Sequence, residues 1–382
     1  MAIIEFPSSQ YFYYNSSFKL ESGETLPKFT LAYETFGKLN SDKTNAILIF
    51  HALSGSAHVT RNEEEFKLDK GIKGWWENLV GPNKSFDTKK YFIICTNVIG
   101  SCYGSTGPSS INPKTSKFYA LDFPIITIHD MVKAQKLLIE YLEIDQLLTV
   151  TGGSMGGMLA LDWFLNYPET VKSIIPIATT LQSSPQNIAF NEVGRQAIIR
   201  DPNWNNGNYY SSEPPQFGLS IARMIGHITY LSDGLMRIKF GRKIQEVSNE
   251  ANDNNFKFGQ KFCVESYLNY KGLSFTKRFD ANSYLYITKA IDYFDIYSDK
   301  KILDNLTNKQ SIFKDKKSLI LCFKSDWLYP ISESKQIAKF FKKYNIRTTF
   351  CKIDSNYGHD AFLIEDYTQG KLIKCFLKNI ET

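Results

Sequence analysis

One serine flanked by glycines constrains the fold of this chain more than any other feature of its sequence. Residues 152–157 read Gly-Gly-Ser-Met-Gly-Gly and contain the pattern G-x-S-x-G centred on Ser154. The apolar run 147–151 precedes this pattern and a helical run, 158–166, follows it, so the sequence predicts a strand, a sharp turn and a helix in succession. Glycines permit the close backbone contacts of such a turn. The arrangement predicts a nucleophilic hydroxyl at a helix N-terminus, above the carboxyl end of a strand.

A serine nucleophile requires a general base, and the chain contains five histidines. In proteins with this strand–turn–helix motif the base follows the serine in the sequence, which leaves His227 and His359. His359 follows the predicted strand 348–353 through a short loop, where such a fold places its base. His227 lies in a predicted helical segment and is interpreted as a structural residue.

The base in turn needs a carboxylate that orients its ring. Asp326 lies just after the predicted strand 318–323, which precedes the strand of the base. A carboxylate there would hold the imidazole in the productive tautomer and stabilise its charged form. The sequence therefore predicts Ser154, Asp326 and His359 as a catalytic triad.

Two backbone amides are predicted to hold the negative oxygen of an acyl-transfer intermediate. One is the N–H of Met155, the residue after the nucleophile, and the other belongs to the loop after an early strand. The predicted strand 46–50 continues into His51-Ala52-Leu53, and by its position the Leu53 N–H is the candidate. His51 itself is interpreted as a packing and hydrogen-bonding residue.

Short apolar strands alternate with amphipathic helices over most of the chain. This alternation predicts an α/β fold with a mostly parallel central sheet and helices on both faces. The predicted strands are residues 29–36, 46–50, 91–95, 147–151, 173–178, 318–323 and 348–353. The predicted helices outside the insertion described below are residues 128–142, 158–166, 332–344 and 361–377.

A long interruption separates the fifth of these strands from the sixth. Residues 183–300 are rich in Asn, Tyr, Phe and Arg and lack buried strand runs, with helices predicted near 219–231 and 264–270. We therefore expect a core domain built from residues 1–182 and 301–382, interrupted by a helical lid at 183–300.

Composition excludes several other classes of protein. Hydrophobic residues make up 43% and charged residues 22% of the 382 residues, and the net charge of +6 is dispersed, which predicts a globular protein without a nucleic-acid partner. Apolar runs are short and the N-terminus does not resemble a signal peptide, so we expect a cytoplasmic protein with no membrane partner. The six cysteines form no C-x-x-C pair, so no metal site is expected.

Seven segments resemble the homoserine O-acetyltransferases of methionine biosynthesis, which are acyltransferases with the α/β-hydrolase fold. The resemblance extends from about residue 20 to residue 375 and includes the lid; an Asn- and Lys-rich stretch, 248–261, departs from it. The segments are HALSGSAHV (51–59), GWWENLVGP (74–82), NVIGSCYGSTGP (97–108), GGSMGGMLALDW (152–163), GLSIARMIGHITYLSDGL (218–235), SDWLYP (325–330) and YGHDAFL (357–363).

The resemblance implies the triad and oxyanion donors already predicted, and it adds substrate contacts. These are Arg223, Asp360 and, in the same helical block as the arginine, Tyr230. Homoserine is a zwitterion, so Arg223 can bind its carboxylate through two hydrogen bonds while Asp360 holds its ammonium. The resemblance also implies acetyl-CoA as co-substrate, no further cofactor, and a homodimer formed through the lid.

Four alternatives compete with this interpretation. Relatives that use succinyl-CoA tend to carry an arginine two residues after the triad aspartate; here that position is Leu328, which favours an acetyl donor. Other relatives acylate serine instead of homoserine. A carboxylesterase or thioesterase on the same fold would use water as the acceptor, and an inert binding module would lack a reactive serine.

Overall fold

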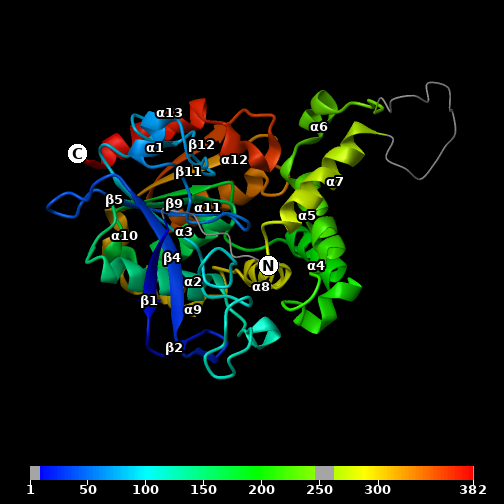
Figure 1. Cartoon of the computed structure of the whole chain (residues 1–382). Helices are drawn as coiled ribbons and strands as arrows, with labels where there is room; N and C mark the ends of the chain where they lie inside the picture. Colours follow the sequence, from blue (N-terminus) through cyan, green and yellow to red (C-terminus); the bar gives the residue numbers. More distant parts are fainter. Residues whose placement is uncertain (1–8, 246–261, 382) are drawn as a thin grey trace.

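The computed structural model describes residues 9–245 and 262–381, and an eight-stranded sheet forms its centre (Figure 1). Strands β8, β5, β9, β10, β11 and β12 run parallel, whereas β4 is antiparallel to both of its neighbours, β1 and β8. The mostly parallel sheet is thus confirmed. In sheet order the strands are β1 (Gln10–Tyr14), β4 (Phe29–Phe36), β8 (Phe92–Thr96), β5 (Ala46–Phe50), β9 (Thr149–Gly153), β10 (Ser173–Ile177), β11 (Lys317–Phe323) and β12 (Arg347–Ile353).

Helices cover both faces of this sheet, as predicted. On β5, Leu48 and Phe50 belong to the core that includes α2 (Ile128–Tyr141), α3 (Met155–Asn166) and α11 (Ile331–Lys343). Ile47 and Ile49 point to the opposite face, into a second core that includes α13 (Tyr367–Glu381). Figure 1 shows α13 on one side of the sheet and α2 on the other. A strand buried on both faces needs apolar residues at every position, which explains the unbroken Ala-Ile-Leu-Ile-Phe run of β5.

Helices occupy the chain between β10 and β11. Within the described residues this stretch contributes no strand to the central sheet, and Figure 1 shows α4 to α7 standing beside the sheet as a group. Residues 248–261 lie outside the described residues. The helices are α4 (Pro185–Ile199), α5 (Gln216–Tyr230), α6 (Asp233–Lys239), α7 (Cys263–Thr276), α8 (Ala281–Asp292), α9 (Lys300–Asn308) and α10 (Gln310–Lys314).

The remaining elements are short. They are β2 (Phe18–Lys19), β3 (Thr25–Leu26), β6 (Val80–Gly81), β7 (Phe86–Asp87), α1 (Glu63–Leu68), α12 (Ala361–Ile364) and the 3-10 turns η1 (Ala120–Asp122), η2 (Pro168–Thr170), η3 (Pro202–Gly207) and η4 (Gly358–Asp360). Of the helices in the described part of the chain, none is long and apolar enough to cross a membrane.

The turn between β9 and α3 is tighter than the predicted turn 152–157. β9 extends to Gly153 and α3 begins at Met155, so Ser154 alone makes the turn. The reason is the close approach of the first helical turn to β5. A Cβ atom on Gly156 would lie 2.3 Å from the Phe50 carbonyl oxygen, and one on Gly152 would lie 2.6 Å from the same atom. These glycines therefore serve close packing rather than an unusual backbone conformation.

The predicted single helix 361–377 is wrong, because the chain forms α12 and α13 with a break at residues 365–366. Two side chains from another part of the chain cap the carbonyl groups of α12. Trp76 Nε1 donates to the Phe362 carbonyl at 2.8 Å, and Asn78 Nδ2 donates to the Leu363 carbonyl at 2.8 Å. Carbonyl groups that are bound in this way no longer require the next helical turn.

We predict that Gly156→Ala destabilises the fold. The added methyl meets backbone that cannot move aside, and overpacking of this kind costs about 1–3 kcal/mol in free energy of unfolding. Gly234→Ala is the matched control, because its Cβ would meet nothing closer than Ser232 Oγ at 3.9 Å; there we expect no loss, or a gain of about 0.5–1 kcal/mol from helix propensity. Urea denaturation of both variants and of wild type measures the free energies of unfolding. Equal stability of Gly156→Ala and wild type would contradict the prediction.

Candidate active site

Ser154 sits in a strained backbone conformation, with φ 60° and ψ −125°. Its N–H donates to the Ile177 carbonyl at 3.0 Å, and its carbonyl accepts from Gly157 N at 2.9 Å and from Thr179 Oγ1 at 2.9 Å. A non-glycine residue keeps such a conformation only when its surroundings leave no alternative. The side chain caps no backbone amide of α3, which leaves the hydroxyl available for chemistry.

His359 and Asp326 form the buried pair that the sequence predicts. His359 Nδ1 lies 2.8 Å from Asp326 Oδ2, and the two side chains are 3% and 0% exposed. The other carboxylate oxygen, Oδ1, accepts from the backbone N–H of Leu328 at 3.0 Å and of Tyr329 at 2.9 Å. These two amides fix the orientation of the carboxylate, so that its remaining oxygen is presented to the imidazole.

Aromatic rings hold the imidazole of His359 from several sides. The ring centroids of Tyr329, Phe362 and Tyr230 lie 5.2, 5.4 and 6.1 Å from that of His359. Phe362 also packs against Gly153, where a Cβ would lie 2.2 Å from its Cδ2 atom. One side chain therefore contacts both the base and the residue that precedes Ser154.

The loop after β5 starts beside the first turn of α3. A Cβ on Gly156 would also lie 3.2 Å from the His51 carbonyl oxygen, and Met155 is the first residue of α3. The N–H groups of a first helical turn have no acceptor within the helix. Residues 52–55 form a tight turn, closed by the bond from Gly55 N to the Ala52 carbonyl at 2.8 Å, and Leu53 occupies its second position. We call residues 52–55 the oxyanion turn.

His51 serves structure, in agreement with its interpretation above. Val98 N–H donates to His51 Nε2 at 3.1 Å, so Nδ1 carries the ring proton and donates to the Ala52 carbonyl at 2.7 Å. Burial lowers the pKa of His51 to about 4. His227 is likewise neutral: burial, followed by Arg223, lowers its pKa to about 3, and its Nδ1 lies 3.1 Å from Tyr267 Oη.

The end of α5 docks directly on the loop that carries His359. Gly358 has φ +70°, and a Cβ there would lie 2.5 Å from Ser232 N and 2.6 Å from the Tyr230 carbonyl oxygen. Only glycine permits both the backbone conformation and the contact. Segments far apart in the sequence are thereby held together at the candidate site.

Arg223, Tyr230 and Asp360 come together beside His359. The Arg223 guanidinium carbon lies 5.5 Å from the Tyr230 ring centroid and 4.6 Å from that of Phe275. Burial raises the pKa of the Asp360 carboxyl, while His359 and then Arg223 act in the opposite direction. Burial also raises the pKa of Tyr230, so its phenol remains a hydrogen-bond donor at neutral pH.

Arg278 is a site residue that the sequence did not reveal. Its Nη1 donates to the Ser54 carbonyl at 3.2 Å and to Tyr103 Oη at 2.7 Å. It lines a cavity of about 470 Å³ together with Arg223, Lys73 and Trp75. An isolated arginine between two helices carries no local pattern, so no signal in the sequence distinguishes it from a surface residue.

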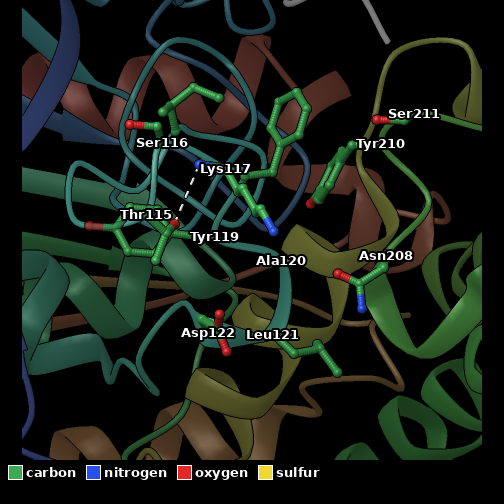
Figure 2. A pocket seen from close by; sticks show the side chains of 12 residues that line it. Thr115, Ser116, Lys117, Tyr119, Ala120, Leu121, Asp122, Asn208, Tyr210 and Ser211 are labelled. Carbon is green, nitrogen blue, oxygen red and sulfur yellow. Dashed lines mark hydrogen bonds between the residues drawn. The ribbon is translucent and has the colours of Figure 1, made fainter.

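A second cavity, of about 830 Å³, contains none of the predicted site residues. Figure 2 shows Lys117, Asp122 and Tyr210 around it, on the loop before α2 and the segment before α5. The described part of the chain also contains no group of three His, Cys, Asp or Glu side chains that could hold a metal ion.

The parallel sheet, with a strained serine after β9 and a His–Asp pair after β12 and β11, is the architecture of an α/β hydrolase. A family model of the alpha/beta hydrolase fold matches residues 45–366. The homoserine O-acetyltransferase of Methanohalobium evestigatum is 53% identical over 371 residues, 97% of this chain and 73% of that protein. That of Desulfotalea psychrophila is 50% identical over 95% of this chain and 91% of its own length. The chain belongs to the homoserine O-acetyltransferase family of the α/β hydrolases.

Solved structures give the same fold with two different activities. The homoserine O-acetyltransferase of Bacillus anthracis superimposes with a TM-score of 0.84 at 28% identity, covering 97% of both chains. Esterase E22 superimposes with a TM-score of 0.85 at 29% identity, covering 97% of this chain and 99% of its own. Overall shape therefore does not separate acyl transfer from ester hydrolysis.

We predict that Asp326→Asn slows the reaction of Ser154 with a fluorophosphonate by about 10⁴-fold. The Leu328 and Tyr329 amides would hold the new amide oxygen, which turns the NH₂ group toward His359 Nδ1 and forces the wrong imidazole tautomer. Asp354→Asn is the matched control, because this carboxylate is 73% exposed and pairs with Lys324. Labelling followed by intact-mass spectrometry measures both rates; a near-normal rate for Asp326→Asn would mean that another group orients the base.

Proposed function

We propose that the protein transfers an acetyl group from acetyl-CoA to the γ-hydroxyl of L-homoserine, through an acetyl-serine intermediate on Ser154. The observation that carries this proposal is the buried His359–Asp326 pair, 2.8 Å apart, which Phe362 links to Gly153, the residue before the strained Ser154. The names of relatives that are about half identical over nearly the whole chain support the donor and the acceptor. Acetyl-homoserine supplies the methionine pathway, and no cofactor beyond acetyl-CoA enters the scheme.

In the first half-reaction, Ser154 Oγ attacks the carbonyl carbon of the thioester while its proton passes to His359 Nε2. The carbonyl oxygen becomes negative and accepts hydrogen bonds from the Leu53 and Met155 amides. The carbon–sulfur bond then breaks, CoA leaves with the proton from His359, and Ser154 is acetylated. Asp326 stabilises the imidazolium at each proton transfer.

In the second half-reaction, the hydroxyl of homoserine takes the place of CoA. His359 removes its proton, the hydroxyl oxygen attacks the acetyl carbon, and the bond to Ser154 breaks as the serine regains a proton from His359. The same two amides hold the oxyanion. The products are O-acetylhomoserine and the free enzyme.

Three residues near His359 make a binding site for a zwitterion. Arg223 binds the carboxylate of homoserine, Asp360 binds its ammonium, and the phenol of Tyr230 donates a further hydrogen bond. The cation of the substrate compensates the charge of Asp360, whose pKa is raised by burial. Acceptor binding should therefore weaken as the pH falls through that raised pKa, where the carboxyl becomes neutral.

The surroundings of Asp326 support an acetyl donor over a succinyl donor. Leu328, bound through its N–H to Asp326 Oδ1 at 3.0 Å, is a neutral residue at the position where succinyl-using relatives tend to carry an arginine. Leucine supplies no cation for a succinyl carboxylate, and burial of an unpaired carboxylate is unfavourable. A small acyl group meets no such cost.

Ester hydrolysis is the second candidate function, because esterase E22 is as similar in structure as the acetyltransferase. An esterase has no need for paired charges that recognise an amino acid. The arrangement of Arg223 and Asp360 beside the base therefore favours transfer.

The helices of residues 183–300 act in this scheme as a lid on a core made of residues 1–182 and 301–382, and they form a homodimer. Apolar side chains recur on the outer surface of the lid helices: Phe217, Ile221 and Ile228 on α5 are 73%, 48% and 44% exposed, and Tyr270 on α7 is 67% exposed. An apolar face of this kind is typical of a subunit interface. Sedimentation velocity should give twice 43.8 kDa, and Ile221→Asp should shift the species toward the monomer.

Two experiments test the proposed activity. The release of CoA is measured with acetyl-CoA or succinyl-CoA, each with homoserine, serine or water as acceptor; acetyl-CoA with homoserine should be fastest. Incubation with acetyl-CoA alone should add one acetyl group to the peptide containing Ser154, and Ser154→Ala should lose both acetylation and about 10⁶-fold in kcat. Turnover of Ser154→Ala at a tenth of the wild-type rate would exclude the covalent mechanism, and faster hydrolysis than transfer would favour the esterase.

We predict that Arg223→Ala separates the two half-reactions. Acetylation of Ser154 should stay near the wild-type rate, whereas transfer to homoserine should lose the 2–5 kcal/mol (about 30- to 5,000-fold) typical of truncating one partner of a buried charge pair. Arg223→Lys should retain only part of the wild-type transfer rate, because lysine cannot make the planar two-point contact. Stopped-flow release of CoA with and without homoserine measures both steps. Slow acetylation of Ser154 with normal transfer to homoserine would instead place Arg223 in the acetyl-CoA site and contradict its role in binding homoserine.

A further inference from the structure

Two arginines from the helices between β10 and β11 converge on one residue of the oxyanion turn. Arg223 Nη1 donates to Ser54 Oγ at 3.3 Å, and Arg278 Nη1 donates to the Ser54 carbonyl at 3.2 Å. Ser54 directly follows Leu53, whose N–H is one of the proposed oxyanion donors. The turn belongs to the core, yet its position depends on side chains from α5 and from the connection between α7 and α8.

The contacts of Arg278 hold it in a single orientation. Both protons of Nη1 are used, one by the Ser54 carbonyl and the other by Tyr103 Oη at 2.7 Å. The guanidinium carbon lies 5.0 Å from the centroid of the Phe275 ring. Tyr103 is 6% exposed and packs edge-on against Phe279 at 5.8 Å. A planar cation bound at this many points cannot rotate without breaking several contacts.

The start of the turn is held by groups of the turn itself and of the core. Gly55 N and His51 Nδ1 both donate to the Ala52 carbonyl, at 2.8 and 2.7 Å. The Ser54 carbonyl has only Arg278 as its donor among the described residues. Removal of that guanidinium would leave the backbone of Ser54 without its carbonyl contact, and only the bond from Arg223 to the Ser54 hydroxyl would remain.

The two arginines are not equivalent during the reaction. In the proposed function Arg223 binds the carboxylate of homoserine, so its bond to a serine hydroxyl is exchanged for the substrate. The bond of Arg278 to a backbone carbonyl requires no such exchange. Arg278 can therefore keep the turn in place through both half-reactions.

We propose that Arg278 is a positioning residue that holds the oxyanion turn so that the Leu53 N–H points at the oxygen bonded to the carbon under attack. This inference rests on the proposed function, in which Ser154 is the nucleophile. Misplacement of a catalytic group by about 1 Å costs about 10²-fold in rate, and complete loss of one oxyanion donor costs about 10²–10³-fold.

The test uses a reagent that needs neither CoA nor homoserine. A fluorophosphonate loses fluoride as Ser154 Oγ bonds to phosphorus, and its P=O oxygen occupies the same oxyanion site. Arg278→Ala should slow this reaction by about 10²-fold, Arg278→Lys should recover part of the rate, and Tyr103→Phe should have a smaller effect. Lys277→Ala, an exposed neighbour, is the matched control and should react like wild type. Thermal unfolding of each variant identifies any that has lost its fold.

A second measurement separates positioning from donor binding. Acetylation of Ser154 is followed with acetyl-CoA and with p-nitrophenyl acetate, which lacks the CoA carrier. A positioning role requires the rate to fall by a similar factor with both donors while KM changes little. If Arg278→Ala raised KM for acetyl-CoA and left p-nitrophenyl acetate and the fluorophosphonate unaffected, the residue would bind the donor and the proposal would be wrong. Failure of wild type to react with the fluorophosphonate would instead refute the nucleophile.

Discussion

The contact between α3 and the carboxyl end of β5 is the constraint on which the rest of the candidate site depends. Gly156 brings the helix so near to the Phe50 carbonyl that a Cβ would lie 2.3 Å from its oxygen. Because the helix starts this close to the sheet, the chain must reverse at Ser154 alone, in a strained conformation. The same contact brings the loop that follows β5 beside the first amide of α3. One steric requirement thus accounts for the position of Ser154, the proposed nucleophile, and of both proposed oxyanion donors.

The inserted helices contribute to the site as much as the sheet does. α5 presents Arg223 and Tyr230, and its end rests on Gly358, where a side chain would clash with Ser232 N at 2.5 Å. Arg278 reaches the oxyanion turn from the other end of the same group of helices. In the proposed function, Ser154 must be shielded from water while it is acetylated. The inserted helices contact the oxyanion turn and the loop of His359, and the proposed lid role would add this shielding.

Much of the core was predictable because each local pattern has few solutions. A run such as Ala46–Phe50, apolar at every position, fits only a strand covered on both faces, and the structure confirms it. The ends of elements were less predictable. The predicted helix 361–377 breaks because Trp76, 286 positions away from Phe362, donates to its carbonyl. The turn at Ser154 is shorter than predicted because Gly152 and Gly156 pack closely against the backbone of β5. Local conformational propensities do not predict such a contact.

The sequence by itself determined the chemical parts and their order: a serine, an acid and a base, each after its own strand, since glycine and apolar spacing encode strand, turn and helix locally. Only the tertiary structure decided which parts meet. It joins His359 to Asp326 at 2.8 Å, and it brings Arg278 to the carbonyl of Ser54, 224 positions earlier in the chain. A hydrogen bond across such a separation leaves no periodic trace in the sequence, because it depends on how the sheet and the inserted helices pack as a whole.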